Sequence, residues 1–186
     1  IELRYSYNFE KAKAQITAEM QKLRASLVGG KWQYKNNPVV LTILIRTEDE
    51  RKQIGNYVAG QLEKLGFITN RVYKTAGEAS PLWLGADPAD GTFHLYTGAW
   101  VPSVLDRDEA GNFNYFYTKR GRPEMLWQAY KPDPQFDVLS EQPARRDFHT
   151  EQDRLEKMAH ALRLSMEDSV RVWVCNRISY FARNKN

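Results

Sequence analysis

The chain has 186 residues, which is enough for one ordinary domain with a sizeable core, and we expect residues 1–186 to form a single domain. Its composition is that of a globular protein, because 42% of the residues are hydrophobic and 27% are charged. The 27 Lys and Arg residues exceed the 23 Asp and Glu residues, but these charges are interspersed, so the excess does not by itself indicate nucleic-acid binding.

Cysteine content and hydropathy exclude several classes of protein. The single cysteine, Cys175, excludes an internal disulfide and a cysteine-based metal cluster. No stretch approaches the roughly 18 consecutive apolar residues of a membrane helix. The first ten residues have neither the basic region nor the apolar region of a signal peptide. We therefore expect that the chain is part of a longer protein whose targeting segment lies upstream.

The first half of the chain predicts a β-α-β unit that follows an amphipathic helix. Helical spacing predicts the first helix over residues 8–27, ended by Gly29 and Gly30. The nearly continuous β-branched and leucine run at 38–45 predicts a strand buried on both faces. A second helix follows, with a capping box from Thr47 to Glu50 and an end at Gly66. Residues 67–73 then predict a second strand, parallel to the first.

The second half of the chain is less regular. Residues 76–89 predict a short helix broken by Pro81 and Pro88, and residues 92–97 predict a third strand. A long connection over 98–148 contains one expected helix at 123–130. Helical spacing returns at 150–168, where Leu155, Met158, Leu162 and Met166 share one face. Two strand-like runs, 170–176 and 178–184, complete the chain.

The expected strand order directs attention to Trp100. In a doubly wound sheet the first strand lies between the other two, and ligands bind where the winding reverses, at the carboxyl ends of the strands. Thr47 lies at one of these ends, as a helix cap beside amides that suit an anion, and Gly98 and Ala99 lie at the other. The small residues Gly98 and Ala99 would let the backbone turn and would leave space for a ligand to approach. Trp100 would then stand over the crevice, although a core position for this tryptophan is equally open.

Recognisable catalytic motifs are absent from the sequence. It contains no GxGxxG, GxxxxGK[ST], GxSxG or HExxH pattern, and its three histidines lack the spacing of metal ligands. The densest aromatic stretch, NFNYFY at 112–117, suits either stacking on bases or sugars or the packing of a strand. We expect no enzyme activity, no cofactor and no metal site.

Four blocks of the sequence, taken in order, resemble the C-terminal lobe of family 5 extracellular solute-binding proteins, the peptide, nickel and oligosaccharide receptors of ABC importers. The blocks are YNFEKAKAQI, PVVLTILIRTEDERKQIGNYVAGQLEKLGF, GTFHLYTGAW and LSMEDSVRVWVCNRISYFARNK. In that family a long helix ends in Leu-x-x-x-Gly before a strand, which Leu62 and Gly66 match. A strand closing in Gly-x-Trp is matched by Gly98 and Trp100.

The resemblance implies an α/β fold, one periplasmic-binding-protein-like type II lobe with a mainly parallel open sheet flanked by helices. The solute would lie between this lobe and an N-terminal lobe of the same chain outside residues 1–186, and the two lobes would close by a hinge. Peptide-binding members carry a carboxylate three residues after the tryptophan, where this sequence has Ser103. A hydroxyl anchors an ammonium group less strongly than a carboxylate does. A sugar or another neutral solute is therefore favoured over a peptide as the ligand.

The expected function is therefore solute capture outside the cytoplasm, in the periplasm or on an extracellular membrane anchor, by a monomer that delivers its ligand to the membrane subunits of an ABC importer. The ligand-binding residues would be Thr47, Gly98, Ala99, Trp100 and Ser103. Two alternatives remain open: an α/β enzyme domain whose catalytic residues lie outside this sequence, and a basic, aromatic-rich nucleic-acid binder.

Overall fold

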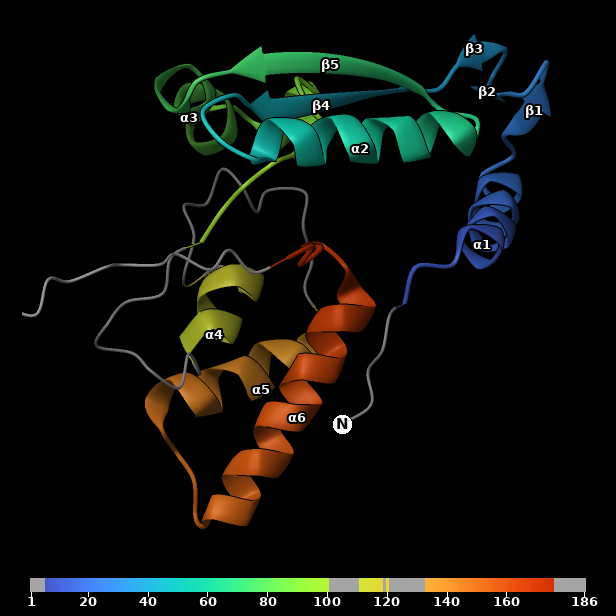
Figure 1. Cartoon of the computed structure of the whole chain (residues 1–186). Helices are drawn as coiled ribbons and strands as arrows, with labels where there is room; N and C mark the ends of the chain where they lie inside the picture. Colours follow the sequence, from blue (N-terminus) through green and yellow to red (C-terminus); the bar gives the residue numbers. More distant parts are fainter. Residues whose placement is uncertain (1–5, 101–110, 119, 121–132, 176–186) are drawn as a thin grey trace, which may run out of the picture. The chain divides into compact units, whose positions relative to one another are not determined.

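The computed structural model describes residues 6–100, 111–118, 120 and 133–175 (Figure 1). The chain divides into two compact units. The first unit, residues 1–109 and 119–131, contains all the described strands and is called here the sheet unit. The second, residues 110–118 and 132–186, has three helices among its described residues and is called the helical unit. The expectation that residues 1–186 form one lobe of a two-lobed protein stays a prediction.

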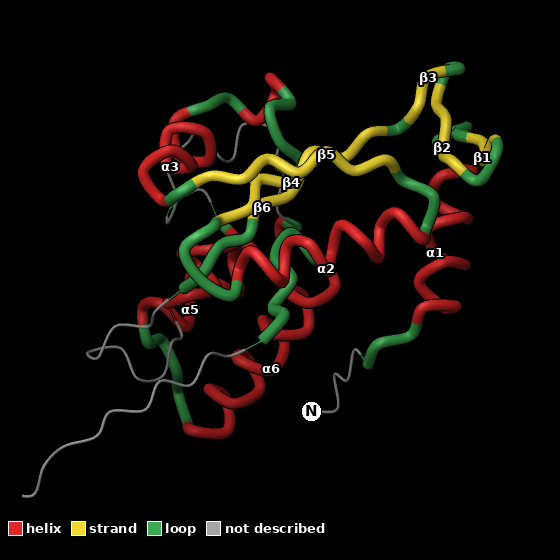
Figure 2. The backbone as a smooth tube through the Cα atoms, turned by 45° about the horizontal axis from the view of Figure 1, so that its top comes forward, coloured by secondary structure: helices red, strands yellow, loops and turns green. Residues whose placement is uncertain are grey.

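Three parallel strands form the central sheet of the sheet unit (Figures 1 and 2). Strand β4, Val40–Arg46, lies in the middle, with β5, Ile68–Lys74, on one side and β6, Leu95–Tyr96, on the other. Both neighbours pair with β4 in the parallel sense. The predicted β-α-β unit and strand order are therefore confirmed, and the carboxyl ends of β4 and β6 lie at the same edge of the sheet.

Helix α2, Arg51–Lys64, connects β4 to β5 and packs on one face of this sheet. Ile43, Ile45 and Ala59 form a core cluster in which no residue is more than 1% exposed. The helix ends before Gly66, as predicted, because Gly66 has a φ of 98°, a left-handed conformation that glycine adopts without strain. Helix α3, Ala76–Gly85, and the short 3-10 helix η1, Pro88–Asp90, then lead to β6. Contrary to the prediction, α3 runs through Pro81 without a break, and Thr75 and Glu78 form a capping box at its first turn.

The prediction of one helix over residues 8–27 was wrong at its C-terminal end. Helix α1, Phe9–Lys22, is capped by Asn8 as expected, but Arg24 takes a positive φ of 62° and turns the chain. A small antiparallel sheet follows: β1, Ser26–Val28, β2, Lys31–Tyr34, and β3, Asn37–Pro38. Gly29 and Gly30, expected to end the helix, connect β1 to β2. Trp32, only 2% exposed, anchors this sheet because its Nε1–H donates to the Leu65 carbonyl at 2.8 Å.

The described part of the helical unit contains α4, Gly111–Tyr117, α5, Pro134–Arg145, and α6, Glu151–Asp168. Its core is formed by Phe116, Tyr117, Phe136 and Ala161. Residues 112–117, for which strand packing or stacking on bases or sugars was expected, form α4 instead. Helix α5 was not predicted, and the helix expected at 123–130 lies outside the described residues.

Helix α6 has the predicted bounds, and Thr150 caps it by accepting from the Asp153 amide. Its predicted apolar face is only partly buried, since Met158 and Met166 are half-buried whereas Leu155 is 50% exposed and Leu162 is 41% exposed. Ala161 and Ser165 are buried instead. Aromatic side chains from α4 and α5 fill the core, so small residues of α6 suit the contact.

The first of the two predicted C-terminal strands, 170–176, is not found in its described residues. Residues 170–175 have no regular secondary structure, and the run at 178–184 lies outside the described residues. A strand forms only when another backbone supplies its hydrogen bonds, and the described part of the chain provides no such neighbour for residues 170–175.

Candidate functional site

The predicted convergence of the β4 and β6 ends is present in the structure. Leu44 pairs with Tyr96 in the parallel register, and the Thr97 amide donates to the Leu44 carbonyl at 3.1 Å. One residue further, the Arg46 amide donates to the hydroxyl oxygen of Thr97 at 2.9 Å. Residues 46–48 and 96–100 are called here the strand-end site.

Strand β6 has only two residues, and a side chain holds it at each end. At its start the His94 amide donates to the Thr42 carbonyl at 2.8 Å, while His94 Nδ1 accepts from the Thr42 amide at 2.9 Å. At its end Thr97 accepts from Arg46. His94 therefore has a structural role. It fixes the start of the strand that leads to Trp100.

Thr47 does not cap helix α2, so the predicted capping box was wrong. The helix begins at Arg51, and no side chain caps it at Glu50. Instead the Thr47 hydroxyl donates to the Lys74 carbonyl at 3.4 Å, which connects the ends of β4 and β5. The Arg51 amide, in the turn where we considered an anion site, donates to the Asp49 carboxylate at 3.1 Å. A ligand-binding role for Thr47 stays a prediction.

Arg46 and Glu48 form an ion pair at the centre of the strand-end site that the sequence analysis missed. Arg46 donates from Nε and Nη2 to the two oxygens of Glu48, at 2.9 and 3.1 Å, and from Nη1 to the Tyr96 hydroxyl at 3.2 Å. Glu48 also accepts from the Ala76 amide at the start of α3. The pair thus connects β4, β6 and α3, so it fixes the geometry of this edge of the sheet.

The pair also fixes the charge of Glu48. Hydrogen bonding from the Arg46 guanidinium, opposed by partial desolvation, lowers the pKa of Glu48 to about 2, and the same bond raises the pKa of Arg46. The Glu48 side chain is 37% exposed and that of Arg46 is 13% exposed. Both charges are therefore present across the physiological pH range.

We expect the Glu48 carboxyl to titrate near pH 2 when its side-chain NMR signal is followed. In Arg46→Met the midpoint should rise toward the ordinary value of 4.5, because the charged partner is lost. The pair stabilises the fold above the unfolded pKa of Glu48, and this stabilisation is lost as the pH falls from about 4.5 toward about 2. Arg51→Met, which removes the neighbouring partner of Asp49, serves as the control. A Glu48 midpoint that is the same in the wild type and Arg46→Met would contradict the assignment.

Aromatic side chains gather around Tyr96. Trp83 of α3 stacks on the Tyr96 ring with centroids 5.4 Å apart, and Phe93 meets the same ring edge-on at 6.4 Å. The three side chains are partly exposed. Because Tyr96 also bonds Arg46, the aromatic group and the ion pair belong to one arrangement at the carboxyl end of the sheet.

The three residues that follow Thr97 are exposed. The Gly98 amide donates to the Tyr96 carbonyl at 3.0 Å, so the backbone turns there as expected. A Cβ at Gly98 would lie 3.6 Å from the Tyr96 ring, an ordinary contact, so space alone does not demand glycine. Trp100 is 39% exposed, which excludes a sealed core position. Ser103 lies outside the described residues, and ligand-binding roles for Gly98, Ala99, Trp100 and Ser103 stay predictions.

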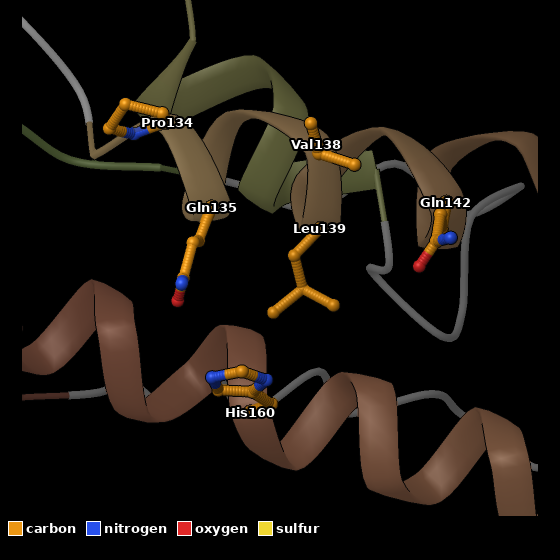
Figure 3. A pocket seen from close by; sticks show the side chains of 6 residues that line it. All are labelled: Pro134, Gln135, Val138, Leu139, Gln142 and His160. Atoms are coloured by element: carbon orange, nitrogen blue, oxygen red, sulfur yellow. The ribbon is translucent and has the colours of Figure 1, made fainter.

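A separate groove lies in the helical unit, between α5 and α6 (Figure 3). Its volume is about 590 Å³, and it is lined by Pro134, Gln135, Val138, Leu139, Gln142 and His160. None of these residues was predicted as a site residue. Among the described residues, no three His, Cys, Asp or Glu side chains are grouped to hold a metal ion. In the same part of the chain, every helix is too short or too polar to cross a membrane.

No family model and no curated protein matches this sequence. Several solved structures share its fold, and two of them are described here. NikZ from Campylobacter jejuni, in complex with Ni(L-His), superimposes with a TM-score of 0.65 and 16% identity, over 89% of this chain and 31% of its own. The oligopeptide-binding protein AppA from Bacillus subtilis, in complex with a nonapeptide, gives a TM-score of 0.63 and 14% identity, over 88% and 30%.

These comparisons confirm the expected fold class, a mixed α/β fold with a parallel sheet that is similar to part of periplasmic-binding-protein-like structures. Both similar structures are family 5 solute-binding proteins, as the sequence blocks suggested. The chain spans about a third of the length of either protein.

Proposed function

We propose that this chain is the ligand-binding, C-terminal lobe of an extracytoplasmic solute-binding protein, which captures a solute and delivers it to an ABC importer. The observation that carries the proposal is the strand-end site. Parallel strands β4 and β6 end side by side, and the chain continues from β6 directly to Trp100, which is 39% exposed. Ligands of open α/β sheets bind beyond this edge.

The chemistry of the site supports a binding role. Trp83, Tyr96 and Trp100 offer aromatic faces, which pack against the C–H groups of sugars and the apolar parts of peptides. Arg46 and Glu48 already bond each other, so they hold the edge rigid before any ligand arrives. A site of this kind suits holding a ligand in one orientation rather than catalysing its reaction. Among the described residues of the site, no nucleophile is paired with a base.

The proposed solute is a peptide, an oligosaccharide or a similar molecule. NikZ was solved with Ni(L-His) and AppA with a nonapeptide, so the shared fold accommodates ligands of different size. Ser103 replaces the carboxylate that would hold a peptide ammonium group, which favours a neutral solute. The N-terminal lobe of the same protein would cover the solute from the opposite side.

The proposal is tested by a thermal-shift screen of the complete protein against peptides, oligosaccharides and metal ions. A solute that binds the native state raises the melting temperature, because its binding stabilises the folded protein by an amount that grows with the logarithm of the ratio of free solute to Kd. Residues 1–186 alone should respond weakly, because they provide only one side of the site. Turnover of a bound compound, or binding to nucleic acid that added salt abolishes, would replace the proposal with one of the two alternatives.

Trp100→Ala in the complete protein should weaken binding of the solute found in that screen by about 10- to 100-fold, because an aromatic contact is lost. Isothermal titration calorimetry measures this change. Tyr57→Ala is the matched control, since Tyr57 is an aromatic residue of the same unit, 57% exposed on α2 and outside the strand-end site. Unchanged affinity in Trp100→Ala would remove Trp100 from the site.

A further inference from the structure

The hairpin formed by β1 and β2 ends in an exposed tip, residues 27–31, called here the hairpin tip. Val28 pairs with Lys31, and the two glycines between them make the whole turn with positive φ values of 56° and 75°. A Cβ at either glycine would meet nothing within 4 Å. Leu27 is 53% exposed and Val28 is 51% exposed. The tip is therefore open to solvent, with one aliphatic side chain on each face of the ribbon.

Strand β1 lacks the charges that usually protect the edge of a sheet. It is an outer strand in the order β1-β2-β3, and all three of its residues are exposed. Edge strands commonly carry lysine or another charged side chain, which prevents association with other chains. Here the outer strand carries leucine and valine, and the lysine lies on the inner strand β2. Edge protection does not explain this arrangement, which suits a contact that covers apolar side chains.

Basic side chains accompany the hairpin tip. The segment from Lys22 to Lys35 contains four basic residues and no acidic residue. Lys22 is paired with Glu19 at 2.7 Å, whereas Arg24, Lys31 and Lys35 are exposed and form no ion pair with a carboxylate of the described residues. The hairpin thus presents three positive charges beside its exposed aliphatic side chains.

Glu63 is close enough to Lys31 for their charges to interact. Its carboxylate, however, already accepts from the Thr69 hydroxyl and pairs with Arg71 at 2.7 Å. Glu63 is therefore engaged by side chains of β5 and is not available to bond Lys31 directly. The positive charge of the hairpin remains directed at a partner outside the chain.

We propose that the hairpin tip binds the surface of an anionic lipid bilayer. Leu27 and Val28 would enter the interfacial layer, and Arg24, Lys31 and Lys35 would contact lipid phosphates. Burial of the apolar side chains and attraction of the basic ones to anionic headgroups act together at such a surface. Each basic residue there raises the affinity about 5-fold, so three supply about 100-fold. This inference goes beyond the proposed function, which needs no direct contact with lipid.

The position of the hairpin is compatible with solute binding. The hairpin lies at the amino end of β4, because β3 leads directly into that strand (Figures 1 and 2). The strand-end site lies at the carboxyl ends of β4 and β6, at the opposite end of the same sheet. A bilayer that covers the hairpin tip would therefore leave the strand-end site open.

The combination of aliphatic and basic side chains favours a lipid surface over other occupants. A second copy of the chain would bring the same three positive charges to the contact, and like charges oppose association. A nucleic acid is bound by aromatic side chains that stack on its bases, whereas Leu27 and Val28 are aliphatic. A bilayer accepts both kinds of side chain without requiring a partner of matching shape.

Vesicle flotation tests the proposal, with the complete protein expressed in the cytoplasm of a bacterial host so that no lipid is attached to it. The protein should float with vesicles made of equal parts of phosphatidylcholine and phosphatidylglycerol, but not with vesicles of phosphatidylcholine alone. Added salt should weaken the binding, because it screens the charges. Lys31→Gln/Lys35→Gln should lower the partition coefficient by about 10- to 30-fold, and Val28→Ser should lower it by about 3- to 10-fold.

The matched control is Lys11→Gln/Lys13→Gln, which changes the net charge by the same amount near the start of α1. Lys11 lies about 16 Å along the helix from Lys22, at a rise of 1.5 Å per residue, which exceeds the distance over which salt screens exposed charges. This variant should change binding by less than about twofold. Circular dichroism verifies that each variant folds.

No binding to the anionic vesicles, or equal binding to both kinds of vesicle, would overturn the inference. Equal losses in the two double-lysine variants would also overturn it, since net charge alone would then account for binding. Unchanged binding in Val28→Ser would exclude the hairpin tip from the contact. A dimer that Val28→Ser abolishes, or tighter binding to an oligonucleotide than to vesicles, would replace the bilayer with that partner. Solute affinity of the same variants should equal that of the wild type, so the proposed function is tested separately.

Discussion

Gly55→Ala should lower the free energy of unfolding of the sheet unit by about 1–3 kcal/mol, because the added methyl group overpacks the core. A Cβ at Gly55 would lie 2.8 Å from both Cγ1 and Cγ2 of Ile45, and Ile45 is fully buried. These atoms are close to the Ile45 backbone, so they cannot swing away as the tip of a long side chain would. Helix α2 would have to move away from β4, immediately before Arg46 and the strand-end site. Urea denaturation followed by circular dichroism measures the loss.

Gly60→Ala is the matched control, because Gly60 lies in the same helix and has open space around its Cα. Alanine favours a helix over glycine by up to about 1 kcal/mol, so this variant should be as stable as the wild type or more stable. The two substitutions are chemically identical and should change stability in opposite directions. Equal effects would mean that α2 does not pack closely on Ile45.

The central sheet could be predicted from the sequence because its signals are strong and local. The run at 38–45 is apolar enough to be buried on both faces, and Ile43, Leu44 and Ile45 are at most 1% exposed. Gly66 marks the end of α2 through its left-handed conformation. The order of the three strands then followed from the preference for doubly wound sheets.

Elements that depend on distant contacts could not be predicted in the same way. Leu23 and Leu27 continue the helical spacing of α1, yet the chain turns at Arg24 and forms β1. What decides this is Trp32, whose ring is buried among residues far along the sequence and whose Nε1–H bonds Leu65. Residues 112–117 likewise favour a strand by composition but pack as a helix against α5 and α6. Tertiary packing overrides local preference in both segments.

The sequence predicted that the ends of β4 and β6 converge, but it did not predict the ion pair that lies there. Topology placed Thr47 and Gly98 at one edge, and the register of β4 and β6 has this arrangement. The Arg46–Glu48 pair was missed because two residues separated by one position carry no helical or metal-ligand pattern. Its importance comes from Tyr96 and the Ala76 amide, which reach it from other parts of the chain. Only the folded chain shows those contacts.

Phe136→Ala should lower the stability of the helical unit by about 3–5 kcal/mol, the largest effect expected in this protein. Phe136 is 1% exposed, and its ring meets Tyr117 at 5.2 Å and Phe113 at 6.4 Å. Truncation leaves a cavity between α4 and α5 that these rings cannot fill without losing their own contacts. Because all the members of this core cluster belong to the helical unit, hydrogen exchange should accelerate in α4, α5 and α6 and remain slow in β4.

Val138→Ala, two residues further along α5, is the control for Phe136→Ala. Val138 is 62% exposed, so its truncation should change stability by no more than about 0.5 kcal/mol. If Phe136→Ala also accelerated exchange in β4, the two units would unfold as one. Arg171 and Trp173 also contact this core, since they bond Phe116 and Tyr117, which pack with Phe136. Loosening the core should therefore release residues 170–174 from α4, which faster hydrogen exchange of the amides in this segment would detect.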